Sequence, residues 1–397
     1  MSKWKNHTPD GTQDTLIDET KAIRRIQKSI MEVFESFGYG ELKTPAFEFY
    51  DVFEGDIDQE QMLKFFDAQG RILVLRPDIT TPMARLYANK LAGDLPQRVC
   101  YSGNAYRNRK MNAGLKLTEF TQSGVELVNA GGSEADAEVI AVCIKALLAA
   151  GLDDFLIEIG QVEFFKEIMK QSGLSEEKAE QIRVLIDQKN TLGVYETLSE
   201  ISMDEELKQV INDLPQMFGD ISIIEKAERL NVSEKAKAAL ANLKEVYEIL
   251  EDFGLSQYIS IVLGMVKGLD YYTGIIFKGY TRGLGFHVCG GGRYDKLIGK
   301  FGAEAPATGV AIGIEMLLSA LYRQGKIKDT FQIDTLVCYA DGFRKEAFSL
   351  AEQLRGSGKV VEMQSMALEP ALRYASKKSI QKICYCADGK VQEVSAL

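Results

Sequence analysis

Two strand-like segments joined by a basic loop constrain the fold of this 397-residue chain more than any other feature. Residues 98–102 and 120–128 read as β-strands, and the polar loop between them contains glycine and carries basic side chains from Arg107 to Lys116. Such a loop joins neighbouring strands as a hairpin, and hairpin strands run antiparallel. The sequence therefore predicts an antiparallel sheet flanked by helices, which is an α+β architecture.

Amphipathic helices are expected on either side of this hairpin. Residues 19–37 repeat apolar side chains at three- and four-residue steps, and Gly38 stops the pattern. Ser133, with Asp136 three residues later, indicates the capped start of a helix that runs to Gly151. The same reasoning predicts a helix at 83–91, strands at 42–48, 71–75, 155–160, 259–263 and 272–280, and a glycine-rich turn at 289–292.

The pattern changes twice along the chain, and these changes predict the domain organisation. Residues 162–255 show helical periodicity with many charges, which is typical of an inserted helical subdomain. The last stretch alternates strands at 335–339, 359–363 and 382–386 with helices at 343–354 and 368–377, which is a small α/β module. We expect a core of residues 1–161 and 256–325, a helical insertion at 162–255, and a C-terminal α/β domain at 330–397.

Charge and cysteine content argue against several classes of protein. The net charge of −10 repels a nucleic-acid backbone. The six cysteines have no CxxC spacing and only two histidines accompany them, so we expect no metal site. Cysteines in apolar runs, such as Cys143 and Cys338, are typical of buried thiols in a reducing cytoplasm. No stretch reads as a signal peptide or a transmembrane helix, so a cytoplasmic protein without membrane association or cofactor is expected.

Two residue clusters carry chemistry that suits a binding pocket. Residues 267–274, Lys-Gly-Leu-Asp-Tyr-Tyr-Thr-Gly, place a cation, a carboxylate and two phenols beside a strand, and such a group can hold a zwitterion with an imidazole. By composition alone the cluster fits a sheet edge equally well. Residues 289–295, Cys-Gly-Gly-Gly-Arg-Tyr-Asp, lack a Cβ at three successive positions, which lets backbone approach a ligand, although a glycine run is usually only a turn.

Together the two clusters closely resemble the histidine-binding signatures of histidyl-tRNA synthetases, and further motifs extend the resemblance along essentially the whole chain. Residues 9–14 resemble that family's Pro-Arg-Gly-Thr start, and the helix ending at Thr44-Pro45 resembles its dimer-forming class II motif 1. Residues 76–80 resemble the segment that holds the amino group, and Tyr106-Arg107 with residues 119–126 resembles motif 2. The resemblance implies a class II synthetase-like core followed by a shortened anticodon-binding-like domain.

The same resemblance, carried over position by position, implies a histidine pocket. Its carboxylates and amide can accept hydrogen bonds from an α-ammonium or the ring, its arginine can pair with a carboxylate, and its tyrosines can grip the imidazole. No catalytic residue and no metal ligand is implied. The implied histidine-binding residues are Asp78, Thr80, Arg107, Gln122, Glu126, Lys267, Tyr271, Tyr272 and Tyr294.

Groups that a synthetase uses to handle ATP are replaced in this sequence. The motif 3 arginine that clamps ATP is Met316, and a thioether cannot pair with a phosphate. The arginine of the first histidine-binding signature is Lys267, and the motif 2 glutamate is Arg109. The motif 2 loop arginine is Thr118, with Lys116 as a nearby charge. Several losses in one subsite indicate a lost reaction, because activation requires the developing charge to be neutralised.

An amino-acid pocket without an ATP clamp resembles the regulatory subunits of short-form ATP phosphoribosyltransferase, which opens histidine biosynthesis. That resemblance implies a non-catalytic, histidine-binding homodimer that joins catalytic subunits into a hetero-oligomer, supports their activity and transmits feedback inhibition by histidine. We do not expect tRNA to bind, because the chain is acidic and its last domain is short. The alternatives are a divergent active histidyl-tRNA synthetase and an ATP-dependent ligase for another acceptor, and both need the missing phosphate clamp.

Overall fold

Two compact units make up the chain, and they divide between Ile327 and Lys328, with Leu16–Lys21 grouped with the C-terminal unit. The computed structural model describes residues 4–55, 57–108, 117–266, 271–328 and 330–395. Each unit has its own sheet and its own hydrophobic core. Within the described ranges, no helix is long and apolar enough to cross a membrane.

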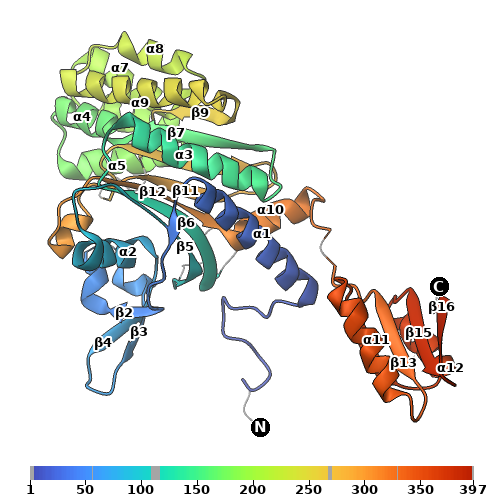
Figure 1. The fold of residues 1–397 in the computed structure, drawn as a ribbon. Helices are drawn as coiled ribbons and strands as arrows, with labels where there is room; N and C mark the ends of the chain where they lie inside the picture. The colour runs from blue at the N-terminus through green and yellow to red at the C-terminus, as the bar shows by residue number, and fades with distance from the viewer. Residues whose placement is uncertain (1–3, 56, 109–116, 267–270, 329, 396–397) are drawn as a thin grey trace. The chain divides into compact units, whose positions relative to one another are not determined.

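The larger unit is built on a nine-stranded sheet in the order β1-β5-β6-β12-β11-β10-β7-β9-β8 (Figure 1). The predicted hairpin is confirmed, because β5 and β6 pair antiparallel from Gln97↔Val128 to Tyr106↔Glu119. All neighbours from β5 to β7 are antiparallel, whereas β1 with β5 and β7 with β9 are parallel. The strands are β1 Gly40–Glu41, β5 Gln97–Tyr106, β6 Glu119–Val128, β7 Phe155–Gln161, β8 Phe218–Gly219, β9 Ile259–Val262, β10 Ile275–Thr281, β11 Cys289–Arg293 and β12 Ala307–Gly313.

Helices α1 (Ile17–Ser36) and α3 (Gly132–Ala149) lie across one face of this sheet (Figure 1). In α1 the buried side chains, including Ile26, Ile30 and Phe34, recur at four-residue steps, so the predicted apolar stripe is confirmed. They join one large core with α3 and the sheet. Helix α10 (Ile314–Arg323) follows β12 and adds its own buried leucines to this core.

The predicted cap of α3 is wrong, because tertiary partners take both residues. The Ser133 hydroxyl donates to Glu245 at 2.6 Å, and the Asp136 carboxylate pairs with Arg293 at 2.9 Å. Gly131 takes the N-cap position without any side-chain hydrogen bond. The Ser133 and Asp136 side chains therefore bind residues far along the chain and do not cap the helix.

One strand prediction and one turn prediction also differ from the structure. The strand expected at 42–48 is strand only at its end, in β2 (Phe47–Phe49). The carbonyls of Thr44 and Pro45 accept hydrogen bonds from the Arg76 guanidinium instead of from a neighbouring strand. The expected turn at 289–292 is strand β11, which pairs with β10 and β12. A Cβ on Gly291 would lie 2.1 Å from the Gly309 carbonyl oxygen, so glycine lets the two strands approach.

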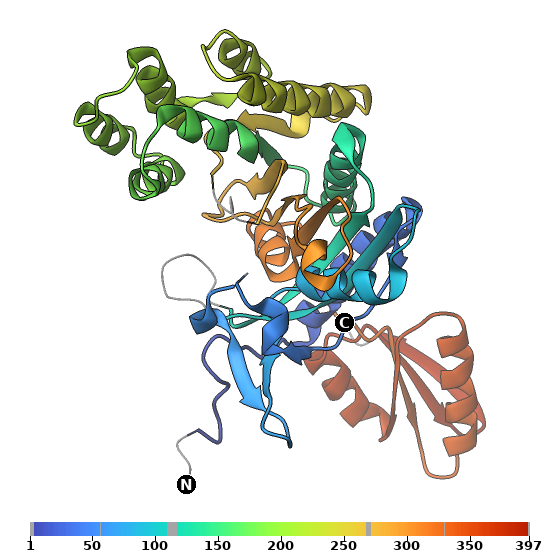
Figure 2. The same cartoon turned by 90° about the vertical axis from the view of Figure 1, so that its left-hand side faces the viewer.

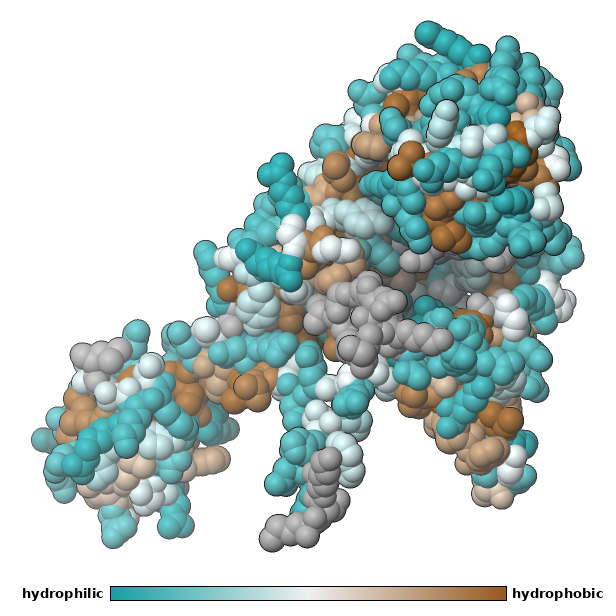
Figure 3. All heavy atoms as spheres, turned by 180° about the vertical axis from the view of Figure 1, so that it is seen from behind, coloured by the Kyte–Doolittle hydropathy of each residue, from teal (hydrophilic) through white to brown (hydrophobic). Residues whose placement is uncertain are grey.

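A small three-stranded sheet, in the order β2-β4-β3, lies beside the start of α2. Phe47, Phe49 and Phe65 are 53%, 45% and 37% exposed, and apolar surface gathers on this sheet (Figure 3). The predicted helix at 83–91 begins earlier, at Thr80, and ends in a π-helical turn. The elements are β2 Phe47–Phe49, β3 Leu63–Phe66, β4 Ile72–Leu75, α2 Thr80–Leu86 and the π-helical η3 Tyr87–Leu91.

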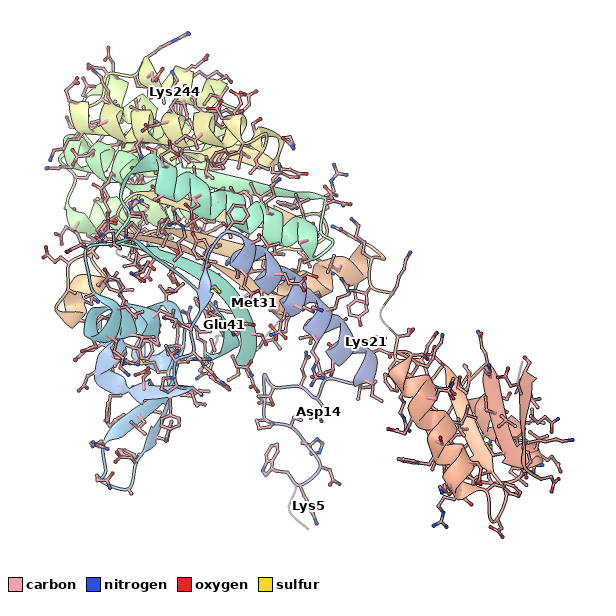
Figure 4. All side chains as sticks on the ribbon, viewed as in Figure 1. Lys5, Asp14, Lys21, Met31, Glu41 and Lys244 are labelled. Atoms are coloured by element: carbon pink, nitrogen blue, oxygen red, sulfur yellow. The ribbon has the colours of Figure 1, made fainter. Side chains whose placement is uncertain are left out.

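Helices α4 to α9 gather at the end of the large sheet where β7, β8 and β9 lie (Figure 2). Polar caps start several of them: Ser175, Asp204 and Ser233 each accept a hydrogen bond from the backbone N–H three residues later. The longest, α9, carries Lys244, which Figure 4 labels. Their bounds are α4 Val162–Ser172, α5 Glu176–Asp187, α6 Thr191–Ser199, α7 Glu205–Asp213, α8 Ser222–Glu228 and α9 Glu234–Asp252.

The C-terminal unit is a four-stranded sheet in the order β14-β13-β15-β16, with a helix on each face. Alternation along β13 sends Leu336 and Cys338 toward α12 and Val337 toward α11, so Cys338 is buried as predicted. Strand β16 was not predicted. The elements are β13 Thr335–Tyr339, α11 Arg344–Gly356, β14 Val361–Ser365, α12 Leu368–Lys377, β15 Lys382–Ala387 and β16 Lys390–Ser395. Single 3-10 turns occur at Tyr50–Phe53, Gln59–Gln61, Leu214–Gln216, Ser256–Tyr258 and Ile298–Phe301.

Candidate functional site

A cavity of about 650 Å³ lies in the larger unit, lined by the β4–α2 connection and by β6, β11 and β12. Its volume is within the range of small-molecule sites. Lys267 lies outside the described residues. The other predicted site residues all line the cavity: Asp78, Thr80, Arg107, Gln122, Glu126, Tyr271, Tyr272 and Tyr294.

Asp78 opens the first turn of α2, and the chain surrounds its carboxylate with donors. The backbone N–H of Thr81 donates to it at 2.8 Å, and the Thr81 hydroxyl donates at 3.3 Å. The Arg107 guanidinium lies 3.8 Å away and also donates to the Pro77 carbonyl at 2.8 Å. A neighbouring cation and backbone donors favour the charged form of a carboxylate. Asp78 can therefore attract a ligand ammonium.

Glu126 lies deeper, on β6, and is 1% exposed. Burial raises the pKa of its carboxyl group to about 8, and the charge of Asp78 adds to the rise, while hydrogen bonds with Tyr294 and Thr80 lower it. The Tyr294 hydroxyl donates to this carboxyl group. Opposite it in register stands Gly309, where a Cβ would lie only 1.8 Å from Glu126 Oε2. Glycine at 309 therefore makes the space that the carboxyl group occupies.

Three tyrosines form a wall of this end of the cavity. The rings of Tyr271 and Tyr272 meet edge-on at 5.0 Å, and Tyr271 and Tyr294 lie 5.5 Å apart. Burial raises the pKa of all three phenols above its ordinary value, so they remain neutral donors at physiological pH. A Cβ on Gly292 would approach the Tyr272 ring to 3.0 Å, and the φ of +154° at Gly292 also favours glycine. The glycine run thus positions an aromatic wall.

An apolar cluster lies at the Met316 side of the cavity. Met316 packs against a cluster that contains Ala105, Leu117 and Phe120. The Glu315 carboxylate is held by the backbone N–H of Thr121 at 2.9 Å. Two further basic side chains line the cavity, those of Lys278 and His287. Arg107 is the only arginine among the described residues that line the cavity, and it is engaged at the opposite end.

The N-terminal segment supplies a contact that sequence reasoning missed. This segment runs before α1 and carries Lys5 and Asp14, which are labelled in Figure 4. The backbone N–H of Thr118 donates to the Gly11 carbonyl at 2.7 Å, and its hydroxyl donates to the Asp10 carbonyl at 3.2 Å. A Cβ on Gly11 would lie 2.2 Å from the Thr118 hydroxyl oxygen. Thr118 therefore anchors the N-terminal segment and does not line the cavity.

Thr118 is also joined to the predicted pocket, because the Arg107 backbone N–H donates to its carbonyl at 2.8 Å. Arg109 and Lys116, two positions where the sequence departs from the synthetases, lie outside the described residues. Gly11 was the available sequence signal for the contact with Thr118, but a motif match alone does not show which residue the glycine contacts.

Comparisons with known proteins decide the family. The family profile described as histidyl-tRNA synthetase matches residues 11–317. An ATP phosphoribosyltransferase regulatory subunit of Acetivibrio thermocellus is 47% identical over 403 residues, covering 100% of this chain and 96% of that protein. The chain belongs to this family of synthetase-like regulatory subunits. A second relative with the same description, from Ruminiclostridium cellulolyticum, is 43% identical over 394 residues and covers 98% of this chain and 94% of that protein.

Solved structures of similar proteins agree with the family. A structure from Bacillus halodurans, described as an ATP phosphoribosyltransferase regulatory subunit/histidyl-tRNA synthetase, matches with a TM-score of 0.88 and 35% identity, covering 97% of this chain and 100% of that one. A histidyl-tRNA synthetase from Nostoc matches in fold, with a TM-score of 0.82 and 23% identity, over 99% of this chain and 98% of that one. The predicted class II synthetase-like fold of this regulatory-subunit family is confirmed.

Proposed function

We propose that this chain binds histidine and, without catalysing aminoacylation, supports and feedback-regulates the catalytic subunit of an ATP phosphoribosyltransferase. The observation that supports this most is the contrast between the two ends of one cavity. Acidic, amide and phenolic side chains converge at one end, and Met316 with its apolar neighbours occupies the other. The relatives' names point to the same role.

Histidine suits the polar end by its chemistry. Asp78 and Gln122 can accept hydrogen bonds from the α-ammonium, and Arg107 can pair with the α-carboxylate. Glu126 and the tyrosines are left for the ring, because a carboxyl group and phenols can hydrogen-bond its nitrogens and the phenol rings can pack against it. By resemblance, Lys267 belongs to the same set. Several polar contacts in a partly apolar cavity give the orientation that recognition of one amino acid requires.

Regulation requires that histidine favour one state of the complex over another, since a ligand shifts an equilibrium only by its differential affinity. The segments at Asp78 and Arg107 are the candidates for transmitting that difference. Arg107 contacts Pro77 and Thr118, and Thr118 holds the N-terminal segment, so ligand contacts at the cavity reach the surface in two steps. We infer a cytoplasmic homodimer within a hetero-oligomer, in keeping with the family resemblance.

ATP–pyrophosphate exchange by the purified full chain, with histidine as the amino acid, tests the non-catalytic assignment. A thermal melt with histidine serves as the control for an intact pocket, and about 100-fold excess over the dissociation constant should stabilise the protein by about 2.7 kcal/mol. Stabilisation without exchange supports the proposal. Exchange would establish the alternative, an active histidyl-tRNA synthetase.

Reconstitution with the catalytic subunit of the same organism tests the regulatory half of the proposal. We expect phosphoribosyltransferase activity to rise when this chain is added and to fall when histidine is then titrated in. Histidine inhibition that persists unchanged with Asp78→Ala, in a complex that still forms, would reject the pocket assignment.

A further inference from the structure

The carboxyl groups of Asp78 and Glu126 lie at the same end of the cavity, the proposed amino-acid end, but in different surroundings. Asp78 is surrounded by backbone N–H, hydroxyl and guanidinium donors. Glu126 is almost completely buried, and its donors are neutral hydroxyl groups, among them those of Tyr294 and Thr80. No ion pair joins Glu126 to a cation anywhere in the described part of the chain. A buried carboxyl group with only neutral donors and an anionic neighbour is favoured in its protonated form.

In the described part of the chain, the elements packed around Glu126 contribute an acid, phenols, the Thr80 hydroxyl, Arg107 and bare backbone. Strand β12 presents Gly309, which has no side chain. Strand β5 presents Tyr101, whose phenol is held neutral because burial raises its pKa well above 10. Among the described residues, the one cation close to this end is Arg107, which is already engaged with Asp78 and the Pro77 carbonyl. Within the same residues, the charged and titratable groups that face Glu126 are Asp78, Tyr101, Arg107, Tyr271, Tyr272 and Tyr294.

We infer that Glu126 recognises the imidazole of histidine as a protonated acid, so that one proton is shared between its carboxyl group and the ring while Asp78 alone supplies the negative charge. This inference rests on the proposed function, that the cavity binds histidine. A protonated carboxyl group offers one O–H donor, and its other oxygen accepts the Tyr294 hydroxyl. The O–H can then donate to an unprotonated ring nitrogen.

The shared proton balances on either side of the hydrogen bond. When it lies on Glu126 the ring is neutral, and when it moves to the ring nitrogen it leaves a carboxylate beside an imidazolium, with the total charge unchanged. Burial raises the pKa of Glu126 to about 8, close to the value of about 6.5 for imidazole, so the two groups compete for one proton. Lysine and arginine lack an acceptor nitrogen and would require Glu126 to ionise first, which selects against them.

The test compares histidine binding to the full chain and to Glu126→Gln by calorimetry between pH 6 and 9. The glutamine keeps an N–H donor but cannot titrate, and the ratio of the two dissociation constants cancels the titration of histidine itself. We expect the dissociation constant of the wild type for histidine to rise about tenfold relative to that of the variant between pH 7 and 9, because Glu126 loses its proton over this range. A flat ratio overturns the inference, since a carboxylate beside a neutral ring takes up no proton. A rise of about a hundredfold over the same range also overturns it, since a carboxylate that pairs with an imidazolium takes up one whole proton throughout.

A second measurement uses the wild-type protein alone and does not depend on the variant folding. Titrations at pH 8 in two buffers of different ionisation enthalpy count the protons exchanged on binding. We expect uptake of about half a proton, because about half of the free Glu126 is ionised there. No uptake, or uptake of a whole proton, overturns the shared-proton inference and leaves the proposed function standing. If histidine does not bind the wild-type chain at pH 7 at all, the proposed function itself fails.

Discussion

The two ends of the cavity differ in how closely their side chains resemble those of a histidyl-tRNA synthetase. At the amino-acid end, Asp78 and Glu126 sit among donors and phenols that suit a polar zwitterion. At the other end, Met316 packs against Phe120 and Leu117, where a synthetase needs charge to hold ATP. The same sheet supports both ends, so a change of side chains can alter the chemistry of the cavity without a change of fold.

The strongest test of the comparison removes the anion at the amino-acid end. Asp78→Ala should weaken histidine binding by about 100-fold or more, because truncating one partner of a desolvated charge pair costs about 3 kcal/mol. Calorimetry measures this. Asp341→Ala, at an exposed site in the C-terminal unit, is the matched control and should bind normally. Equal affinity for both variants would separate histidine binding from this end of the cavity.

The next test fills the space that holds Glu126. Gly309→Ala places a methyl group where Glu126 Oε2 now lies, so we expect about 1–3 kcal/mol lower stability together with weaker histidine binding. Urea unfolding measures the first effect. Gly40→Ala, a strand glycine with nothing within 4 Å of its Cβ position, should change little. If the two variants behave alike, the pairing of Gly309 with Glu126 does not position the carboxyl group.

A third test follows the proton on Glu126 without any ligand. Its folded-state pKa of about 8 exceeds the usual 4.5, so the folded protein binds the extra proton between these values and loses stability as pH rises through that window. Glu126→Gln removes this loss. We expect urea unfolding at pH 5, 6.5 and 8 to show that the free energy of unfolding of the variant, relative to that of the wild type, rises by about 1.4 kcal/mol per pH unit. A difference independent of pH contradicts the protonated state.

The smallest effect is expected at the apolar end. Met316→Arg restores one charge of the lost clamp but touches no residue of the amino-acid end, so histidine affinity should change by less than about twofold. Because other groups of the clamp are still missing, exchange activity should remain absent. Calorimetry measures the histidine affinity, and an ATP–pyrophosphate exchange assay measures the exchange activity. Exchange regained by this single substitution would mean that the two ends differ by one side chain only.

Much of the architecture could be predicted because its signals are local. The spacing of Ile26, Ile30 and Phe34 fixes a helix face, and the alternation in 120–128 fixes a strand that pairs as a hairpin. The site residues that line the cavity were found by motif resemblance. Their residue types alone would have suited several polar amino acids. Their role in binding histidine stays a prediction until a ligand is measured.

The sequence by itself determined most of the elements, the family and the identity of the side chains around the cavity. Only the tertiary structure decided that Arg76 takes the carbonyls of an expected strand, that the glycine run is strand β11, and that Gly309 makes room for Glu126. The physical reason is the same in each case. Local propensity acts over a few residues, whereas close approach, burial and the resulting proton affinity of Glu126 depend on partners far along the chain.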